Sequence, residues 1–424
     1  MRLRIERERN ERNRRRAERF ADADCFGSVI TFKHFIASNK KCIKGVRWKG
    51  SVQKYEYHGI TEMSNAITTL RAGKLPPFTS TRRITLTERG KKRTITPVTI
   101  NDRMVQRTIC DYSLVPILQS TLIYDNGASM KGKGIDFARN RLRKHLVEAI
   151  REYGPDSYAL IFDFKSFFDS IPHAACERVL RKHFTDERLI KLIMEIIKSY
   201  QYSTVKKLPK GAERDRLFYE LDHNQSYGIC LGSQISQIMA LAVPNMVDHL
   251  IKDKYRVKHY MRFMDDGILF AQSKEFLKEV YSKMKVVAHE LGLKFNDKKT
   301  HIVKLTKGFT FLKVKYCVTP TGKIVKKLAK KSIVRMRRKL KKFRHLVDEW
   351  KMTLDDVYNS VQSWCAHTKV AMSYHAKKNM LKLYDELFDG YKITKKYNHL
   401  KGGKNGELLQ ADKWAKYRWD CVAA

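Results

Sequence analysis

The chain has 424 residues, enough for two or three domains, and 43% of them are hydrophobic, which is ample for a large core. The formal net charge is +42, from 86 Lys and Arg against 44 Asp and Glu, which indicates a polyanionic partner. Nucleic acid is a better candidate than an anionic membrane, because 20 Tyr, 20 Phe and 5 Trp are interleaved with the basic residues and can stack on bases. No apolar run approaches the ~20 residues of a membrane span and no two of the eight cysteines form a zinc-type pair, so we expect a reduced, cytoplasmic protein without a membrane segment.

The first third of the chain is expected to be mostly helical. Residues 1–75 are predicted to form helices, and the Arg- and Glu-rich start, residues 1–20, indicates a solvated helix rather than a signal peptide. Residues 84–98 contain two β-rich runs about a Glu-Arg-Gly turn, and apolar side chains at helical spacing predict helices over 101–122 and 135–152.

The rest of the chain alternates between strands and helices. The short apolar run at 158–162 predicts a buried strand, residues 258–271 a β-hairpin, and residues near 301–318 further strands. Helices are expected over 173–201, 234–254, 274–291 and the basic stretch 326–388. The polar residues from 391 onward receive no assignment.

Asp163 is the first candidate for chemistry, because it directly follows the buried strand run Ala159–Phe162. A carboxylate at such a strand end is held by a rigid scaffold. A strand-terminating Asp that merely caps the next turn is an equally good explanation when the residue is considered alone.

Asp265 and Asp266 are the second candidate, since they stand between two apolar runs and precede Gly267. Asp-Gly in this position indicates a hairpin turn, for which one Asp suffices. Two adjacent carboxylates repel each other near a low-dielectric strand end unless a cation compensates them. Oxygen ligands suit Mg²⁺ or Mn²⁺, and two such ions are what phosphoryl transfer from a nucleoside triphosphate requires.

Seven blocks of this sequence resemble those of reverse transcriptases, and they occur in the family's order. The blocks are GKKRTITPVTINDRMVQRTI (90–109), GASMKGKG (127–134), FDFKSFFDSI (162–171), CLGSQISQ (230–237), FMDD (263–266), LGLKFNDKKT (291–300) and FTFLKVKY (309–316). The resemblance implies an α+β, right-hand polymerase fold and RNA-directed DNA polymerase activity. It places an N-terminal helical extension at 1–75, fingers at 76–155, a palm with an antiparallel sheet and some fingers elements at 156–318, a helical thumb at 319–390 and a tail at 391–424.

The resemblance also implies which residues bind metal. Asp163 and Asp265 would bridge two Mg²⁺ ions, with Mn²⁺ as the alternative, and Asp266 is the adjoining acidic residue. The backbone carbonyl of Phe164 would complete the ligands of the ion that holds the nucleotide. The 14 histidines show no metal-ligand spacing of the His-Glu-x-x-His kind.

Contacts to the incoming deoxynucleoside triphosphate are expected from Lys91, Lys92, Arg93, Phe168, Gly232, Gln234 and Lys299. Phe168 matches the steric-gate position, where a ring would clash with a ribose 2′-hydroxyl. Alternatively, Phe167 and Phe168 both belong to the core; at least one of them is expected to, because neighbours on a strand point to opposite faces. Lys299 would stand near the pyrophosphate or be a surface lysine.

Contacts to the template are expected from Ser236 and Gln237, and contacts to the primer end from Phe311, Leu312 and Lys313. Many retroviral, intron and retron enzymes have Gln-Gly and Ser-Pro where this chain has Leu231-Gly232 and Ser236-Gln237. This departure is more similar to defence-associated bacterial enzymes and to those of diversity-generating retroelements.

We therefore expect a bacterial reverse transcriptase that copies a structured, cognate non-coding RNA into DNA in anti-phage defence. The alternatives are a diversity-generating retroelement enzyme, a group II intron enzyme, and an inactive RNA-binding relic, which the intact aspartates oppose. The template, the primer and the oligomeric state stay open.

Overall fold

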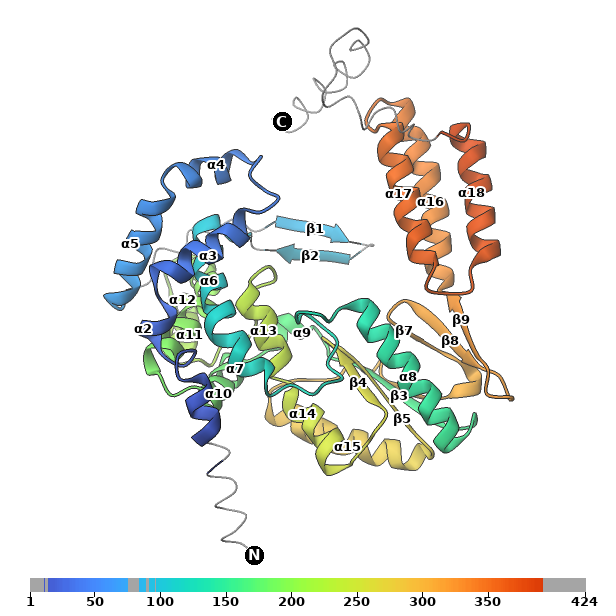
Figure 1. Cartoon of the computed structure of the whole chain (residues 1–424), viewed down its shortest axis with the longest axis horizontal. Coiled ribbons are helices and arrows are strands. Elements are labelled where there is room, and N and C mark those ends of the chain that lie inside the picture. Colours follow the sequence, from blue (N-terminus) through green and yellow to red (C-terminus); the bar gives the residue numbers. More distant parts are fainter. Residues whose placement is uncertain (1–10, 12–13, 75–83, 89–90, 96, 392–424) are drawn as a thin grey trace, which may run out of the picture. The chain divides into compact units, whose positions relative to one another are not determined.

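The computed structural model describes residues 11, 14–74, 84–88, 91–95 and 97–391 (Figure 1). It divides into two compact units: residues 1–312 with 317–324 form unit 1, and residues 313–316 with 325–424 form unit 2. Helices and antiparallel strands both occur, which confirms the α+β class. None of the helices in the described part of the chain combines the length and apolarity that crossing a lipid bilayer takes.

The start of unit 1 is helical, as predicted. Residues 14–20 are helical, and the helices that follow are α2 (Phe26–Val29), α3 (Phe32–Ile43), α4 (Gly50–Tyr57), α5 (Gly59–Arg71), α6 (Ile100–Ile109) and α7 (Val115–Gln119). Threonine caps begin two of them: Thr31 accepts from the His34 N–H and Thr99 from the Asp102 N–H. Strands β1 (Ile84–Glu88) and β2 (Lys91–Ile95) form the predicted antiparallel hairpin between α5 and α6.

An antiparallel sheet of four described strands carries the candidate site of unit 1. Its order is β4-β5-β3-β6, and the strands are β3 (Tyr158–Asp163), β4 (Tyr260–Phe263), β5 (Asp266–Ala271) and β6 (His301–Lys304). Successive side chains of β3 and β5 are buried, so both faces of these strands are covered. Two helices contact β5: α8 (Ile135–Tyr153) and α15 (Lys274–Glu290).

Two of the helices expected from the sequence are each broken in two. Residues 173–201 contain α10 (His173–His183) and the start of α11 (Glu187–Val205), because the Asp186 side chain caps a new helix. Residues 234–254 contain α13 (Gln234–Ala242) and α14 (Asn245–His249), which continues directly as a π-helix, Leu250–Lys254. Pro244 separates α13 from α14, since proline has no N–H to continue the helix.

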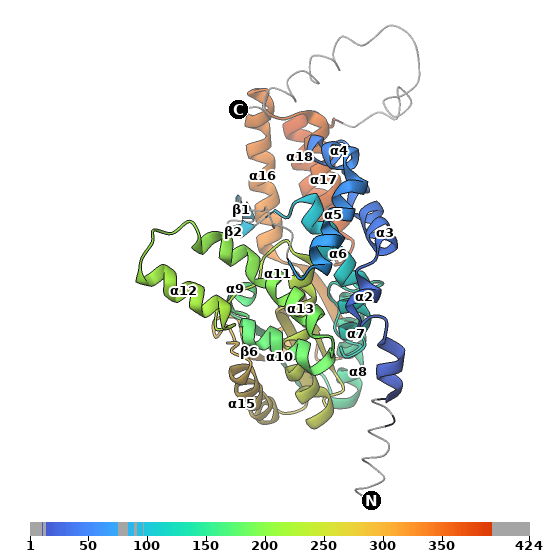
Figure 2. The ribbon, with the colours of Figure 1, turned by 90° about the vertical axis from the view of Figure 1, so that its left-hand side faces the viewer.

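Two short helices were not expected from the sequence: α9 (Phe167–Ser170) and α12 (Ala212–Asp222). Figure 2 shows α12 beside α11 at an outer edge of unit 1.

The final strands form a three-stranded sheet of order β7-β8-β9, made of β7 (Phe309–Phe311), β8 (Val314–Val318) and β9 (Ile324–Leu328). Residues 326–328 therefore end a strand, whereas the sequence pattern placed them in a helix. Unit 2 contains the helices α16 (Lys330–Asp348), α17 (Leu354–Thr368) and α18 (Tyr374–Phe388), which share a core of their own around Leu340, Val361 and Met380. The tail from residue 392 lies outside the described residues.

Candidate active site

Asp163, Asp265 and Asp266 come together where β3 meets the β4–β5 hairpin. Asp163 is the last residue of β3 and pairs in register with Asp266, the first residue of β5. The Phe164 N–H donates to the Asp265 carbonyl at 3.2 Å, which ties the strand end to the hairpin turn. One carboxylate oxygen from each of the three residues lies within 4.8 Å of the other two. The fold thus joins two motifs that are far apart in the chain.

Asp163 is held from a third direction by the segment that follows α15. Asn296 donates its backbone N–H to the Asp163 carbonyl at 2.7 Å and its Nδ2 to Oδ1 at 3.2 Å. The Lys299 Nζ lies 2.6 Å from the Asp163 Oδ2. The expectation that Lys299 stands near the pyrophosphate stays a prediction. Asn296 was not predicted as a site residue. Its position three residues before Lys299, in the same block, is the sequence feature that could have indicated it.

The charges at this site fit a divalent cation. Burial, the negative charge of Asp265 and the hydrogen bond and charge of Asp163 together raise the pKa of Asp266 to about 7. Burial lowers the pKa of Lys299, but its bond to Asp163 outweighs that effect and the pKa is raised overall. Three converging carboxylates with one ammonium group leave negative charge uncompensated. Hard oxygen donors of this kind are the ligands of Mg²⁺ and Mn²⁺.

The hairpin turn differs from the expected Asp-Gly turn. Phe263 pairs with Asp266, so the two-residue loop is Met264–Asp265, and Met264 takes the positive φ of 56°. Gly267 lies inside β5. Glycine is required there for another reason: a Cβ on Gly267 would lie 2.1 Å from the ring of Phe162.

A buried ion pair supports the same turn and was not singled out in the sequence. Arg262 of β4 is fully buried and bonds to Asp248 of α14 through Nε at 2.8 Å and Nη2 at 2.7 Å. Its Nη1 donates to the Met264 carbonyl at 2.9 Å, beside Asp265. The Tyr260 hydroxyl donates to Asp248 at 2.6 Å. An arginine inside an apolar strand run was the sequence signal.

Expected nucleotide contacts lie on α9 and at the start of α13. Phe167 is buried in the core, whereas Phe168 is partly exposed, with ring centroids 5.8 Å apart. Gly232 has a φ of 116°, a conformation that favours glycine, and Gln234 is the half-buried first residue of α13.

The expected template residues differ in exposure, since Ser236 is only 1% exposed whereas Gln237 is exposed. Of the expected primer residues, Phe311 and Leu312 are buried and Lys313 is exposed. Leu312 and Lys313 both have positive φ values, 46° and 68°.

The fingers residues expected to bind the triphosphate lie on β2. The backbones of Lys91, Lys92 and Arg93 pair with β1, and their side chains lie outside the described part of the structure.

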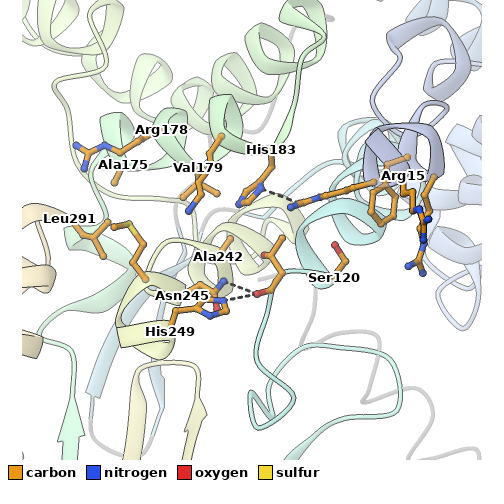
Figure 3. A pocket seen from close by; sticks show the side chains of 16 residues that line it. Arg15, Ser120, Ala175, Arg178, Val179, His183, Ala242, Asn245, His249 and Leu291 are labelled. Carbon is orange, nitrogen blue, oxygen red and sulfur yellow. Dashed lines mark hydrogen bonds between the residues drawn. The ribbon is translucent and has the colours of Figure 1, made fainter. Parts of the chain in front are cut away.

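A cavity of about 850 Å³ with a basic wall lies elsewhere in unit 1 (Figure 3). Its cationic side chains come from the N-terminal helix and from α10; they are Arg15, Arg16, Arg19, Arg178 and Lys182. Arg16 donates to the His183 Nδ1 at 3.1 Å, and burial together with the charges of Arg16 and Lys182 lowers the pKa of His183 to about 4. No Asp or Glu is among the described residues that line this cavity.

Structural comparison finds similarity to telomerases. An apo telomerase from Candida tropicalis truncated from its C-terminal domain has a TM-score of 0.40 and 15% identity, with 64% of this chain and 60% of that chain covered. The apo telomerase from Candida tropicalis has a TM-score of 0.39 and 14% identity, covering 80% and 65%. Telomerase from Candida albicans in complex with a TWJ fragment of telomeric RNA has a TM-score of 0.37 and 11% identity, covering 75% and 63%. The chain thus spans less than two thirds of each of these telomerase chains.

Sequence comparison gives the family. No curated protein matches the chain. Residues 82–316 match the family model described as Reverse transcriptase (RNA-dependent DNA polymerase), and this segment is more than half of the chain and includes Asp163, Asp265 and Asp266. The chain therefore belongs to the reverse transcriptase family.

Proposed function

We propose that the protein is an RNA-directed DNA polymerase that copies an RNA template into DNA from deoxynucleoside triphosphates. The observation that carries this proposal is the convergence of Asp163, Asp265 and Asp266 within 4.8 Å at the end of paired strands. An RNA-binding relic without activity would have no need for three converging carboxylates, one of which, Asp163, is held in place by Asn296 and Lys299.

The three carboxylates are proposed to hold two Mg²⁺ or Mn²⁺ ions, with Asp163 and Asp265 shared between them and the Phe164 carbonyl as a further ligand. Such ions, when bound, lower the pKa of the primer 3′-hydroxyl and stabilise the leaving pyrophosphate. The protein orients the carboxylate oxygens. The backbone hydrogen bond from Phe164 to Asp265 and the hydrogen bond from Arg262 to the Met264 carbonyl fix the positions of the two strand ends. Lys299 keeps positive charge beside the reacting phosphates.

Nucleotide and primer binding are proposed for the residues around this centre. Lys91, Lys92 and Arg93 on the β1–β2 hairpin would contact the triphosphate, and Gly232 and Gln234 would approach the nucleotide. Gln237 would face the template, and the hairpin turn at Leu312 and Lys313 the primer. Unit 2 is proposed to be the thumb, because α16 combines exposed basic residues with an apolar face.

Primer extension with Mg²⁺ and deoxynucleotides tests the assignment of the acidic site. We expect Asp265→Asn and Asp266→Asn each to lower the extension rate by about 10³-fold or more, because metal-ion stabilisation contributes several kcal/mol to such steps. RNA binding should persist in both variants. The matched control is Asp215→Asn on α12, which removes the same charge away from the sheet and should extend normally. Full activity in both site variants would refute the assignment.

The biological role is proposed to be bacterial anti-phage defence, in which the enzyme copies a cognate, structured non-coding RNA. The support is the pattern Leu231-Gly232 and Ser236-Gln237 in the block at 230–237. Sequencing of the RNA and DNA that co-purify with the protein tests this proposal. One structured RNA with its DNA copy is the expected result, whereas copies of a template repeat would favour a diversity-generating retroelement.

A further inference from the structure

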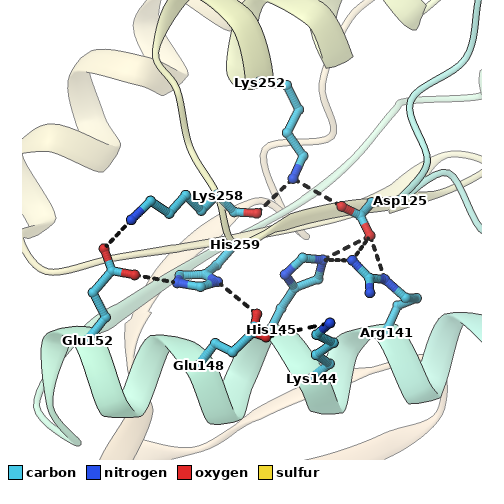
Figure 4. Close-up of polar contacts among 9 residues, drawn as sticks. All are labelled: Asp125, Arg141, Lys144, His145, Glu148, Glu152, Lys252, Lys258 and His259. Carbon is cyan, nitrogen blue, oxygen red and sulfur yellow. Dashed lines mark hydrogen bonds and ion pairs between the residues drawn. The ribbon is translucent and has the colours of Figure 1, made fainter.

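Two histidines and a glutamate converge at a place that the acidic site does not involve (Figure 4). His145 and Glu148 are three residues apart and therefore on one face of α8, and His259 immediately precedes β4. One ligand atom from each of the three residues lies within 4.8 Å of the other two. Both histidines are deeply buried, with 3% and 4% of their surface exposed.

The carboxylates of Asp125 and Glu152 determine which ring nitrogen of His145 and of His259 carries the hydrogen. The His145 Nε2 lies 3.0 Å from Asp125 Oδ1, and the His259 Nε2 lies 3.1 Å from Glu152 Oε2. An ionised carboxylate only accepts, so each Nε2 carries a hydrogen, and in the neutral ring each Nδ1 then offers a lone pair. Arg141 also lies 3.4 Å from the His145 Nε2, but the shorter contact with Asp125 decides the tautomer. Burial lowers the pKa of His259, which favours its neutral form.

Both Nδ1 atoms lack a partner. They are buried, and neither has a hydrogen bond among the described residues. The nearest approach is 3.8 Å, from the His259 Nδ1 to the Glu148 carboxylate, which is too long for a hydrogen bond. Figure 4 shows the two rings, which are arranged edge to face, on either side of the Glu148 carboxylate, with each Nε2 turned outward to its own carboxylate partner. A buried polar atom without a hydrogen-bond partner destabilises the fold, so two such atoms at one point indicate a shared ligand.

We propose that His145, Glu148 and His259 bind a Zn²⁺ ion. Two imidazole nitrogens and one carboxylate oxygen form a common zinc donor set, with bonds of about 2.0–2.2 Å and water in the fourth position. Zinc-binding histidines usually donate their other N–H to a carboxylate, as His145 does to Asp125 and His259 to Glu152. Donors around one ion lie about 3.5 Å apart, so the Glu148 side chain, which is 40% exposed, must move inward.

The surrounding charges make Glu148, rather than Asp125 or Glu152, the carboxylate that is available to bind the ion. Asp125 is already paired with Arg141 at 2.6 Å and with Lys252 at 3.1 Å, and Glu152 with Lys258 at 3.1 Å. The cation nearest to Glu148 in the described structure is the exposed Lys144, at 3.8 Å, which is free to turn toward solvent. The ion would join α8 to β4, the strand that leads to Asp265 and Asp266, and it shares no residue with the acidic site.

Zinc titration of the full-length protein in excess Mg²⁺, which saturates the acidic site, tests the proposal. We expect one tightly bound Zn²⁺ per chain, and loss of that binding in Glu148→Gln, which keeps the size of a half-exposed side chain. Glu152→Gln should weaken zinc binding about 10–100-fold, because Glu152 only orients His259. The matched control is Asp136→Asn on the same helix, whose side chain is 85% exposed and should leave binding unchanged.

Two further measurements separate ligation from misfolding. Zn²⁺ should raise the unfolding temperature of the wild type and of Asp136→Asn but not that of Glu148→Gln. Co²⁺ in place of Zn²⁺ should give visible d–d absorption in the wild type and none in Glu148→Gln. Equal zinc affinity in wild type and Glu148→Gln, or no stoichiometric zinc in the wild type, would overturn the site; neither result bears on polymerase activity.

Discussion

The contact with Phe162, and not the geometry of the turn, explains why glycine stands at position 267, next to the paired aspartates. A Cβ there would lie 2.1 Å from the fully buried Phe162 ring. Gly267→Ala should therefore lower the free energy of unfolding by about 1–3 kcal/mol, as overpacking does, and displace the Asp266 backbone. Urea unfolding measures this change. Gly50→Ala is the control, because a Cβ at Gly50 meets nothing within 4 Å, and equal stability of the two variants would contradict the argument.

Phe168 is the residue at which sugar selection is expected. It is partly exposed while its neighbour Phe167 is buried, so it is the ring that remains accessible to a nucleotide. Phe168→Ala should raise ribonucleotide use relative to deoxynucleotide use by about tenfold or more, because removal of the ring removes the clash with the 2′-hydroxyl and a tenfold change corresponds to only ~1.4 kcal/mol. Competitive primer extension with both nucleotides measures the ratio. Phe167→Leu is the control for a core change, and unchanged selectivity in Phe168→Ala would place the gate elsewhere.

At the scale of elements, the pair of Arg262 on β4 and Asp248 on α14 holds the hairpin that presents the aspartates. Arg262 also donates to the Leu241 carbonyl at the end of α13, at 2.8 Å, so three elements meet at one guanidinium group. Removal of one partner leaves a buried charge unpaired, and Asp248→Asn should therefore lower the free energy of unfolding by about 3–5 kcal/mol. Denaturant unfolding together with primer extension measures both consequences.

Asp253→Asn provides the comparison for this prediction. It removes a carboxylate that pairs with His249 nearby and is 70% exposed, so stability should change by less than about 1 kcal/mol. If Asp248→Asn unfolded at the same denaturant concentration as Asp253→Asn, the Arg262–Asp248 pair would have no structural importance.

For the whole molecule, the net charge of +42 makes RNA affinity depend on salt. The basic cavity of unit 1 is a proposed contact for RNA phosphates, because Arg178 and Lys182 line it without acidic neighbours in the described lining. Arg178→Glu with Lys182→Glu should lower RNA affinity and make the slope of log affinity against log salt shallower by about 1 to 2 units. Filter binding over a salt series measures both quantities.

The control for this prediction has the same change in net charge. Lys274→Glu with Lys278→Glu reverses two exposed lysines on α15. A contact at the cavity predicts a larger loss of affinity for the Arg178 and Lys182 variant. Equal losses in the two variants would show that only the total charge matters.

The sequence by itself predicted which residues form the candidate site. Asp163 follows an apolar strand run, and the adjacent Asp265 and Asp266 repel each other unless a cation compensates them. Asp163 alone is explained equally well as a turn-capping residue, so its selection depended on the resemblance of the seven blocks. The β-hairpin at 258–271 was also predictable, because alternating apolar runs and short loops are local properties.

Only the tertiary structure decided how these parts fit together. The Asp163–Asp266 register, the Phe162 ring against Gly267 and the Arg262–Asp248 pair all join segments distant in the chain. The helix expected over 173–201 breaks where Asp24 accepts from the Thr185 N–H at 2.8 Å, a contact no local pattern contains. His145 and His259 likewise meet only because α8 packs on β4. The local periodicity of the sequence indicates which residues are buried. Which buried residues contact one another depends on packing between elements that are distant in the chain, and only the folded structure brings these together.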